Sequence, residues 1–410
     1  MKGRCRKMIL RLFFCLVFGL ALWWQEPAGV YAKTPLETYT SGKTSPVRSS
    51  ASDYEGSQGE SFGLGDYSQI QAVIDETDSQ SAISFSEIVA SLFNGDLSMT
   101  LEGIGQYIYD HIFSEIDANR KSILQIMGIA ILGAVFTNFS VAFAKNYVAR
   151  TGFYLTYIIL FSLLLTAFLA AYSVAGSVLG FLVEFMSALL PAFCTAIAFA
   201  SGTASAAGFY GVTALAITAV DWLICHVLLG LIQTYMVLSL VNEISREDYL
   251  SRLCGLIRTV ISWSLKTMLG LTLGLNIIQG MVLPAFDSFK NSVFMKVSSI
   301  IPGIGSALNA AARTAIGSGV LIKNAIGAGG LIVIIIICAV PLVKLAVITL
   351  MYKVAEAVIQ PVSDERITEC IRITADSVLL LLMAVGTAIL LFVLSLAVIA
   401  SASNLSVGGG

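Results

Sequence analysis

Six ionisable residues lie within apolar stretches of the chain, and these are the residues whose types could do chemistry. They are Glu184, Asp221, His226, Lys266, Arg313 and Lys344. At the centre of a membrane helix such a residue costs roughly 2.5–3.5 kcal/mol on insertion scales, so it is typical of a polar pathway or an ion pair. We expect Glu184 or Asp221 to pair with Lys344 or Arg313, or to line a polar pathway that also includes His226.

Helical spacing bears on how these residues can meet. Asp221 and His226 are five residues apart, which is about 140° around an α-helix, so the sequence predicts that they do not share a face. Lys266 and Lys344 allow a simpler interpretation, in which their long side chains reach the membrane surface from helix ends. A structural interpretation of the same kind stays open for Glu184 and Asp221.

Known catalytic motifs are absent from the sequence. It contains no HExxH, GxSxG or Walker A motif, and the glycines of 317–330 match a nucleotide-binding loop only by composition. The two histidines, His111 and His226, provide little material for a metal site or a catalytic triad. The seven cysteines lack the close spacing of a zinc or redox motif. We therefore predict no enzyme activity, no catalytic or metal-binding residues and no cofactor.

The composition is that of a membrane protein. Of the 410 residues, 57% are hydrophobic and 12% are charged, and the mean hydropathy is +0.85. Soluble domains have about 25% charged residues. The net charge of −2 provides no basic surface for phosphate groups, so nucleic acid is not an expected partner. The sequence predicts an all-α protein that crosses the lipid bilayer several times.

The first 119 residues divide into three parts. Basic residues precede an apolar core at Leu12–Trp24, and small residues follow at Val30–Ala32, which predicts a signal peptide over 1–32. An uncleaved membrane anchor is the alternative. The stretch 33–66, rich in Ser, Gly and Thr, is typical of a flexible extracytoplasmic linker. Apolar residues at spacings of three and four predict extracytoplasmic amphipathic helices over 67–119.

Residues 120–410 form the predicted membrane domain, with about six spanning helices. They are Ile123–Phe143, Phe153–Tyr172, Tyr210–Leu240, Ser262–Leu283, Ala325–Val347 and Ile373–Ala400. Two Pro/Gly-rich stretches, Gly180–Gly208 and Ile300–Lys323, are expected to form broken or re-entrant hairpins, because irregular backbone at membrane depth needs protein or water around it. Their hairpin and packing positions are Pro191, Gly202, Gly208, Pro302, Gly303, Gly305, Gly317 and Gly319. A surface amphipathic helix is the alternative for Ile300–Lys323.

The sequence predicts an internal repeat that relates the two Pro/Gly-rich stretches. A shift of 111 residues places Pro191 on Pro302 and Gly208 on Gly319. This register predicts two parallel repeat units, 153–240 and 262–350, of a kind found in membrane transport folds. Re-entrant hairpins also leave most arginine and lysine residues in cytoplasmic loops, in agreement with the positive-inside bias. The hairpins and the C-terminus are then expected outside the cytoplasm.

Several long and unusual strings resemble one family of membrane proteins. They are IQGMVLPAFD (278–287), IPGIGSAL (301–308), GSGVLIKNAIGAGG (317–330), VPLVKLAV (340–347) and QPVSDERI (360–367), with HIFSEIDANRKSILQIMGIAILGAVFTNFSVAF (111–143) nearer the N-terminus. From Tyr67 to Ser401 the chain resembles the stage III sporulation protein AE family of endospore-forming bacteria. The resemblance implies a subunit of the channel complex between mother cell and forespore. It would lie in the mother-cell membrane around the forespore and support late forespore gene expression.

The same resemblance implies partners. They would be other stage III sporulation membrane proteins of the complex, through them a forespore membrane protein, and the lipid bilayer; a homo-oligomer is left open. Two other functions stay open as well. One is a secondary transporter or permease of a small solute, with a site between the two hairpins. The other is a non-conducting membrane scaffold that packs its neighbours through small residues.

Overall fold

The structure is a computed structural model that describes residues 67–77, 84–94, 117, 120–121, 123–135, 147–200, 203–244, 250–298 and 305–402. Every regular element among these residues is helical, in agreement with the predicted all-α class. The predicted signal peptide and linker, residues 1–66, lie outside the described residues. So do Gly202, Pro302 and Gly303 of the predicted hairpins.

Five helical elements among the described residues are long and apolar enough to cross a membrane. They are α5 (Tyr147–Ala200), the run of α6 (Thr203–Ala219), η1 (Val220–Leu228) and α7 (Leu229–Ile244), then α8 (Ser251–Ser298), α9 (Gly305–Ile359) and α10 (Glu365–Ala402). Each contains one of the five spans predicted from Phe153 onward. The other predicted span, Ile123–Phe143, is described as the shorter apolar helix Ile123–Val135.

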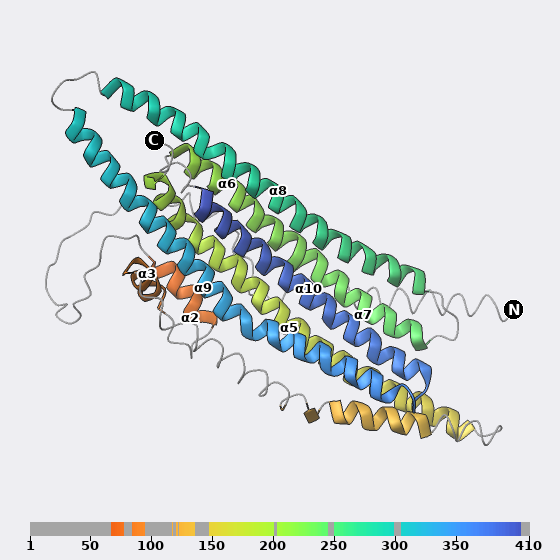
Figure 1. Ribbon diagram of the computed structural model, residues 1–410. Coiled ribbons are helices and arrows are strands. Elements are labelled where there is room, and N and C mark those ends of the chain that lie inside the picture. The colour runs from red at the N-terminus through yellow and green to blue at the C-terminus, as the bar shows by residue number, and fades with distance from the viewer. Residues whose placement is uncertain are drawn as a thin grey trace, which may run out of the picture. The chain divides into compact units, whose positions relative to one another are not determined.

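The central helix of the bundle is α10, which packs against α5, α7, α8 and α9 (Figure 1). Its small and branched residues Ala384, Val385 and Ala388 are fully buried. Two buried hydroxyls, of Thr374 and Ser377, donate hydrogen bonds to carbonyl oxygens one turn earlier, at 2.9 and 2.7 Å. Because these bonds stay within the helix, α10 can be enclosed by its neighbours without leaving either hydroxyl unpaired.

The two predicted hairpin stretches are helical wherever the structure describes them, and the hairpins themselves stay a prediction. α5 stays helical through Pro191 to Ala200, and α6 begins at Thr203. α9 begins at Gly305 and continues through Lys323. A proline inside a membrane helix removes one backbone hydrogen bond, for which neighbouring helices and side chains compensate. The expectation of irregular backbone is therefore wrong for 180–200 and 305–323, where helix packing outweighs the local preferences of Pro and Gly.

The helices are also much longer than the predicted spans. The apolar part of α5, Leu155–Ala200, has 46 residues. At 1.5 Å per residue it is about 70 Å long, whereas a hydrocarbon core is about 30 Å thick. The helix ends do not follow the 111-residue register either, since α5 ends at Ala200 and α8 at Ser298, 98 residues later. The internal repeat stays a prediction.

Two short amphipathic helices, α2 (Ser68–Thr77) and α3 (Phe85–Asn94), dock on the side of the bundle. α2 packs against α5, and α3 packs against α9. The Phe85 amide donates a hydrogen bond to Gln71 Oε1 at 2.9 Å, which joins the start of α3 to α2. The Phe85 ring is fully buried and lies edge-on to Phe185 of α5. Within 67–119, the structure thus describes two helices, α2 and α3.

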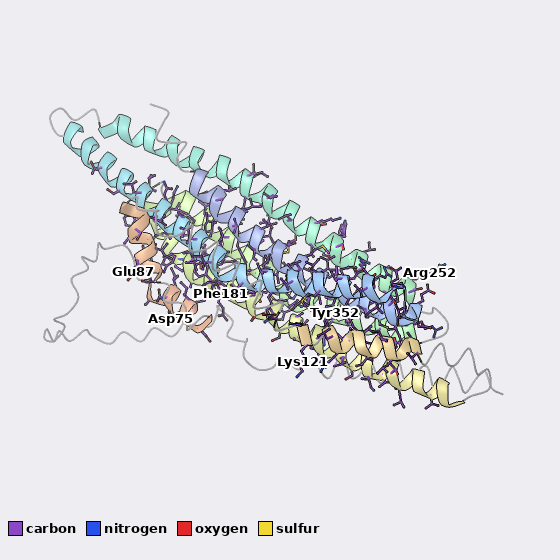
Figure 2. All side chains as sticks on the ribbon, turned by 60° about the horizontal axis from the view of Figure 1, so that its bottom comes forward. Asp75, Glu87, Lys121, Phe181, Arg252 and Tyr352 are labelled. Atoms are coloured by element: carbon purple, nitrogen blue, oxygen red, sulfur yellow. The ribbon has the colours of Figure 1, made fainter. Side chains whose placement is uncertain are left out.

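The connections divide the bundle into two ends. The start of α5, the end of α7, the start of α8 and the α9–α10 turn lie at one end, and the end of α5, the start of α6, the end of α8 and the start of α9 lie at the other (Figure 1). Figure 2 shows Arg252 at the first of these ends, far along the bundle from Asp75 and Glu87 of α2 and α3. We call the first end the basic end. The described helices carry six basic residues here, namely Arg150, Arg252, Arg258, Lys353, Arg366 and Arg372.

Candidate functional site

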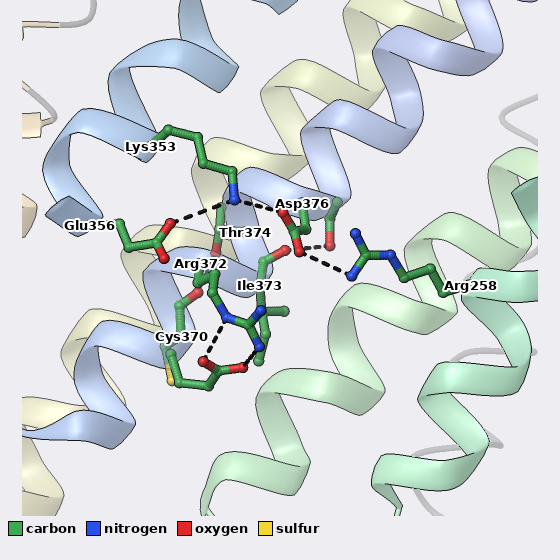
Figure 3. A network of polar contacts seen from close by, with 10 residues as sticks. Arg258, Lys353, Glu356, Cys370, Arg372, Ile373, Thr374 and Asp376 are labelled. Carbon is green, nitrogen blue, oxygen red and sulfur yellow. Dashed lines mark hydrogen bonds and ion pairs between the residues drawn. The ribbon is translucent and has the colours of Figure 1, made fainter. Parts of the chain in front are cut away.

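One buried carboxylate joins three helices near the basic end. Asp376 of α10 has only 9% of its side chain exposed, and cations from two other helices hold it. Lys353 of α9 donates to Asp376 Oδ1 at 2.7 Å, and Arg258 Nη1 of α8 lies 3.2 Å from Oδ2 (Figure 3). Each carboxylate oxygen therefore has its own positively charged partner, which is what a buried carboxylate requires.

A second acid balances the charge of this site. Glu356, one turn along α9, lies 3.5 Å from the Lys353 Nζ atom (Figure 3). We call Arg258, Lys353, Glu356 and Asp376 the ion cluster; it has two cations and two anions and is neutral. The Arg258 and Lys353 side chains remain 44% and 38% exposed, so their stems run along helix surfaces while their charged ends meet Asp376. The ion cluster fixes α8 and α9 against α10.

A buried tyrosine joins the remaining long helices to α10. The Tyr157 hydroxyl of α5 donates to the Leu240 carbonyl oxygen of α7 at 3.1 Å and lies 2.9 Å from the Cys370 Sγ atom of α10. Because the single phenolic proton goes to the carbonyl, the Cys370 thiol is the donor in the second contact. The Tyr157 contacts and the ion cluster share α10, and together they link all five long elements.

Asp221 and His226 lie in the π-helix η1, and there they contact each other. His226 Nδ1 lies 3.0 Å from the Asp221 carbonyl oxygen and 3.8 Å from Asp221 Oδ1. The prediction that these residues occupy different faces is wrong, because a π-helix pairs residues five apart whereas an α-helix pairs residues four apart. Their side chains are 46% exposed for Asp221 and 62% exposed for His226, so the pair lies on the surface of the bundle.

The other predicted site residues do not converge with this pair. Glu184 is exposed on α5, within electrostatic range of Glu76 on α2. Lys344 is half-buried on α9, and Lys266 is exposed on α8. Arg313 belongs to the helical backbone of α9, and its side chain lies outside the described atoms.

Close packing at the far end of the bundle depends on a glycine. A Cβ atom at Gly319 of α9 would lie 2.9 Å from backbone atoms of both Phe199 and Ala200, at the end of α5. Real Cβ atoms do not approach backbone so closely, so a residue without a side chain is required here. Gly317, by contrast, faces open space. Of the other predicted packing positions, Pro191 is exposed on α5.

Sequence reasoning missed the ion cluster. Asp376 is the sole acidic residue in the predicted span Ile373–Ala400, and this isolation is the feature that could have revealed it. The cations that hold it, Arg258 and Lys353, belong to helices α8 and α9. No spacing rule relates residues on three different helices, because their convergence depends on how the helices pack.

Long apolar helices gathered around α10 make this a polytopic α-helical membrane protein. The family model described as stage III sporulation protein AE matches residues 83–403. The chain belongs to this family. Stage III sporulation protein AE of Bacillus subtilis (strain 168) is 27% identical over 315 residues, which are 76% of this chain and 79% of that relative. No solved structure matches the chain.

Proposed function

We propose that this protein is an integral membrane subunit of the channel or secretion complex that links mother cell and forespore, and that late forespore development requires it. The family match over 83–403 carries the proposal, because it covers α3 and every long helix. The five apolar elements support placement in a membrane, and their polar links through α10 support a rigid unit that can serve as part of a larger assembly.

Membership of the complex and the requirement for the protein are tested in an endospore-forming host from which the gene has been deleted. Loss of the protein is expected to stop a late forespore reporter after engulfment, and an affinity-tagged copy is expected to co-purify with other stage III membrane proteins. Normal reporter activity in the deletion strain would refute the proposal. Uptake of a small solute by the purified protein alone, in liposomes, would favour the permease instead.

We also infer that the basic end faces the cytoplasm, since cytoplasmic loops carry the excess of Lys and Arg. The exposed residue Gln360 lies in the α9–α10 turn at this end, and Ser401 lies at the other end of α10. In vegetative cells that express the protein, Gln360→Cys should react with an impermeant maleimide only after the membrane is opened. Ser401→Cys should react from outside, and the reverse pattern would invert the assignment.

A further inference from the structure

The surface of η1 carries an acid and an imidazole beside large apolar side chains. Asp221 and His226 are exposed there, beside Trp222 and Leu215, which are also exposed. The hydroxyl of Thr218, exposed on the same stretch, is satisfied by the Ala214 carbonyl oxygen at 2.9 Å. The acid and the imidazole thus remain the groups on this surface that need a further partner or water.

The Tyr157 contacts fix the depth of this surface. They place Leu240 of α7 level with Cys370 of α10, which precedes Asp376 by six residues, or about 9 Å. The run of α6, η1 and α7 is antiparallel to α10. Asp221 lies 19 residues before Leu240 in this run, or about 28 Å further from the basic end. It is therefore between about 20 Å and 28 Å from the basic end of the apolar region, which is about 2–10 Å inside the opposite boundary of a hydrocarbon core of about 30 Å.

An exposed carboxyl and imidazole are unfavourable against lipid inside this boundary, although the cost falls towards the interface, so cover by protein or water stabilises them. Two further residues favour protein. Ala207 and Gly211, four residues apart on α6, are both exposed, and a Cβ atom at Gly211 would meet nothing within 4 Å. Small residues at this spacing let a second membrane helix approach closely.

We propose that the η1 face (Gly211, Leu215, Thr218, Asp221, Trp222 and His226) packs against the same face of a second copy of this chain in the membrane. The face is self-complementary, since it carries an acid and a base one π-helical turn apart. His226 Nδ1 donates to the Asp221 carbonyl oxygen, so Nε2 is left to form a hydrogen bond with the Asp221 carboxyl of the second copy, with one proton shared between the ring nitrogen and the carboxyl oxygen. A two-fold axis along the membrane normal gives both copies the same orientation.

This inference rests on the proposed placement of the bundle in a membrane but not on the channel complex. The dimer and the channel complex can therefore each fail without affecting the other. The interface is tested with the full-length chain in native membranes, by oxidative cross-linking of a cysteine introduced at Thr218. The matched control is Ile335→Cys. Ile335 is exposed on α9, and α9 does not pack extensively against α6, η1 or α7. The chain without an added cysteine measures the background from native cysteines.

The expected result is a disulfide-linked dimer of Thr218→Cys and no dimer above background for Ile335→Cys. Adding Asp221→Leu or His226→Leu should lower the dimer-to-monomer ratio roughly tenfold, because two interhelical polar contacts are lost by symmetry. Equal cross-linking of both cysteine variants, linkage of Thr218→Cys only to a different polypeptide, or a ratio unchanged by both leucine variants would each overturn the proposal.

Discussion

Replacing Asp376 by asparagine should destabilise the bundle more than removing either of its cationic partners. Asparagine keeps the shape of the side chain but removes the charge that Lys353 and Arg258 approach at 2.7 and 3.2 Å. Breaking a buried ion pair costs about 3–5 kcal/mol, but here water reaches both partly exposed cations and relieves part of that loss. We therefore expect Asp376→Asn to lower the free energy of unfolding by about 2–3 kcal/mol.

Comparison with a variant of one cationic partner, Lys353→Met, makes this prediction refutable. Lys353→Met should cost only about 1 kcal/mol, because Asp376 retains Arg258 and the methionine keeps the apolar stem packed. The double variant should cost less than the sum of the two, because they remove one shared contact. Unfolding of the purified protein in detergent micelles measures all three, with the exposed Lys266→Met as control. An Asp376→Asn variant as stable as Lys353→Met would refute the reasoning.

Four further substitutions are expected to have distinct effects in the same unfolding assay. Gly319→Val forces a side chain against the end of α5 and should cost about 1–3 kcal/mol, whereas Gly317→Val faces open space and should be near neutral. Ser395→Ala removes the acceptor of a buried 2.7 Å hydrogen bond from Asn276 and should cost about 0.6–1.7 kcal/mol; no loss would show that the bond is unimportant. Burial raises the pKa of the Tyr67 phenol above its ordinary 10.0, so stability from the neutral phenol is present below pH 10 and is lost as pH rises through the raised pKa. Tyr67→Phe should abolish that loss and be neutral or slightly stabilising at pH 7, because the buried hydroxyl has no hydrogen-bond partner among the described residues; a less stable variant would contradict this.

Apolar runs locate the five long elements in the sequence, because the requirement for hydrophobicity acts on contiguous residues. They do not locate the ends of those elements. Pro191 and the glycines near Lys323 look like breaks when only local preference is considered. In the structure they lie within helices, and Gly319 serves close packing against α5. The extent of each helix is therefore decided by its neighbours, which the sequence does not display.

For the polar sites too, the sequence predicts features within one helix but not contacts between helices. An α-helical spacing rule separates Asp221 from His226, and a local change to π-helical pairing brings them together. Asp376 can be recognised as unusual from its apolar surroundings, but its partners cannot be recognised, since Arg258 and Lys353 belong to other helices. Rules of spacing apply within a helix, and the ion cluster lies between helices.

The course of α9 has a mechanical consequence. Gly329, against which α3 packs, and Lys353, which holds Asp376, lie 24 residues apart on this one helix, or about 36 Å. Pro341 lies midway between them, and helices bend most readily at a proline. A bend of about 10° there moves Lys353, about 18 Å away, by about 3 Å, which is enough to separate its ammonium group from the carboxylate. A bend of α9 at Pro341 would therefore couple the position of α3, on one side of the proline, to the Lys353–Asp376 ion pair on the other side.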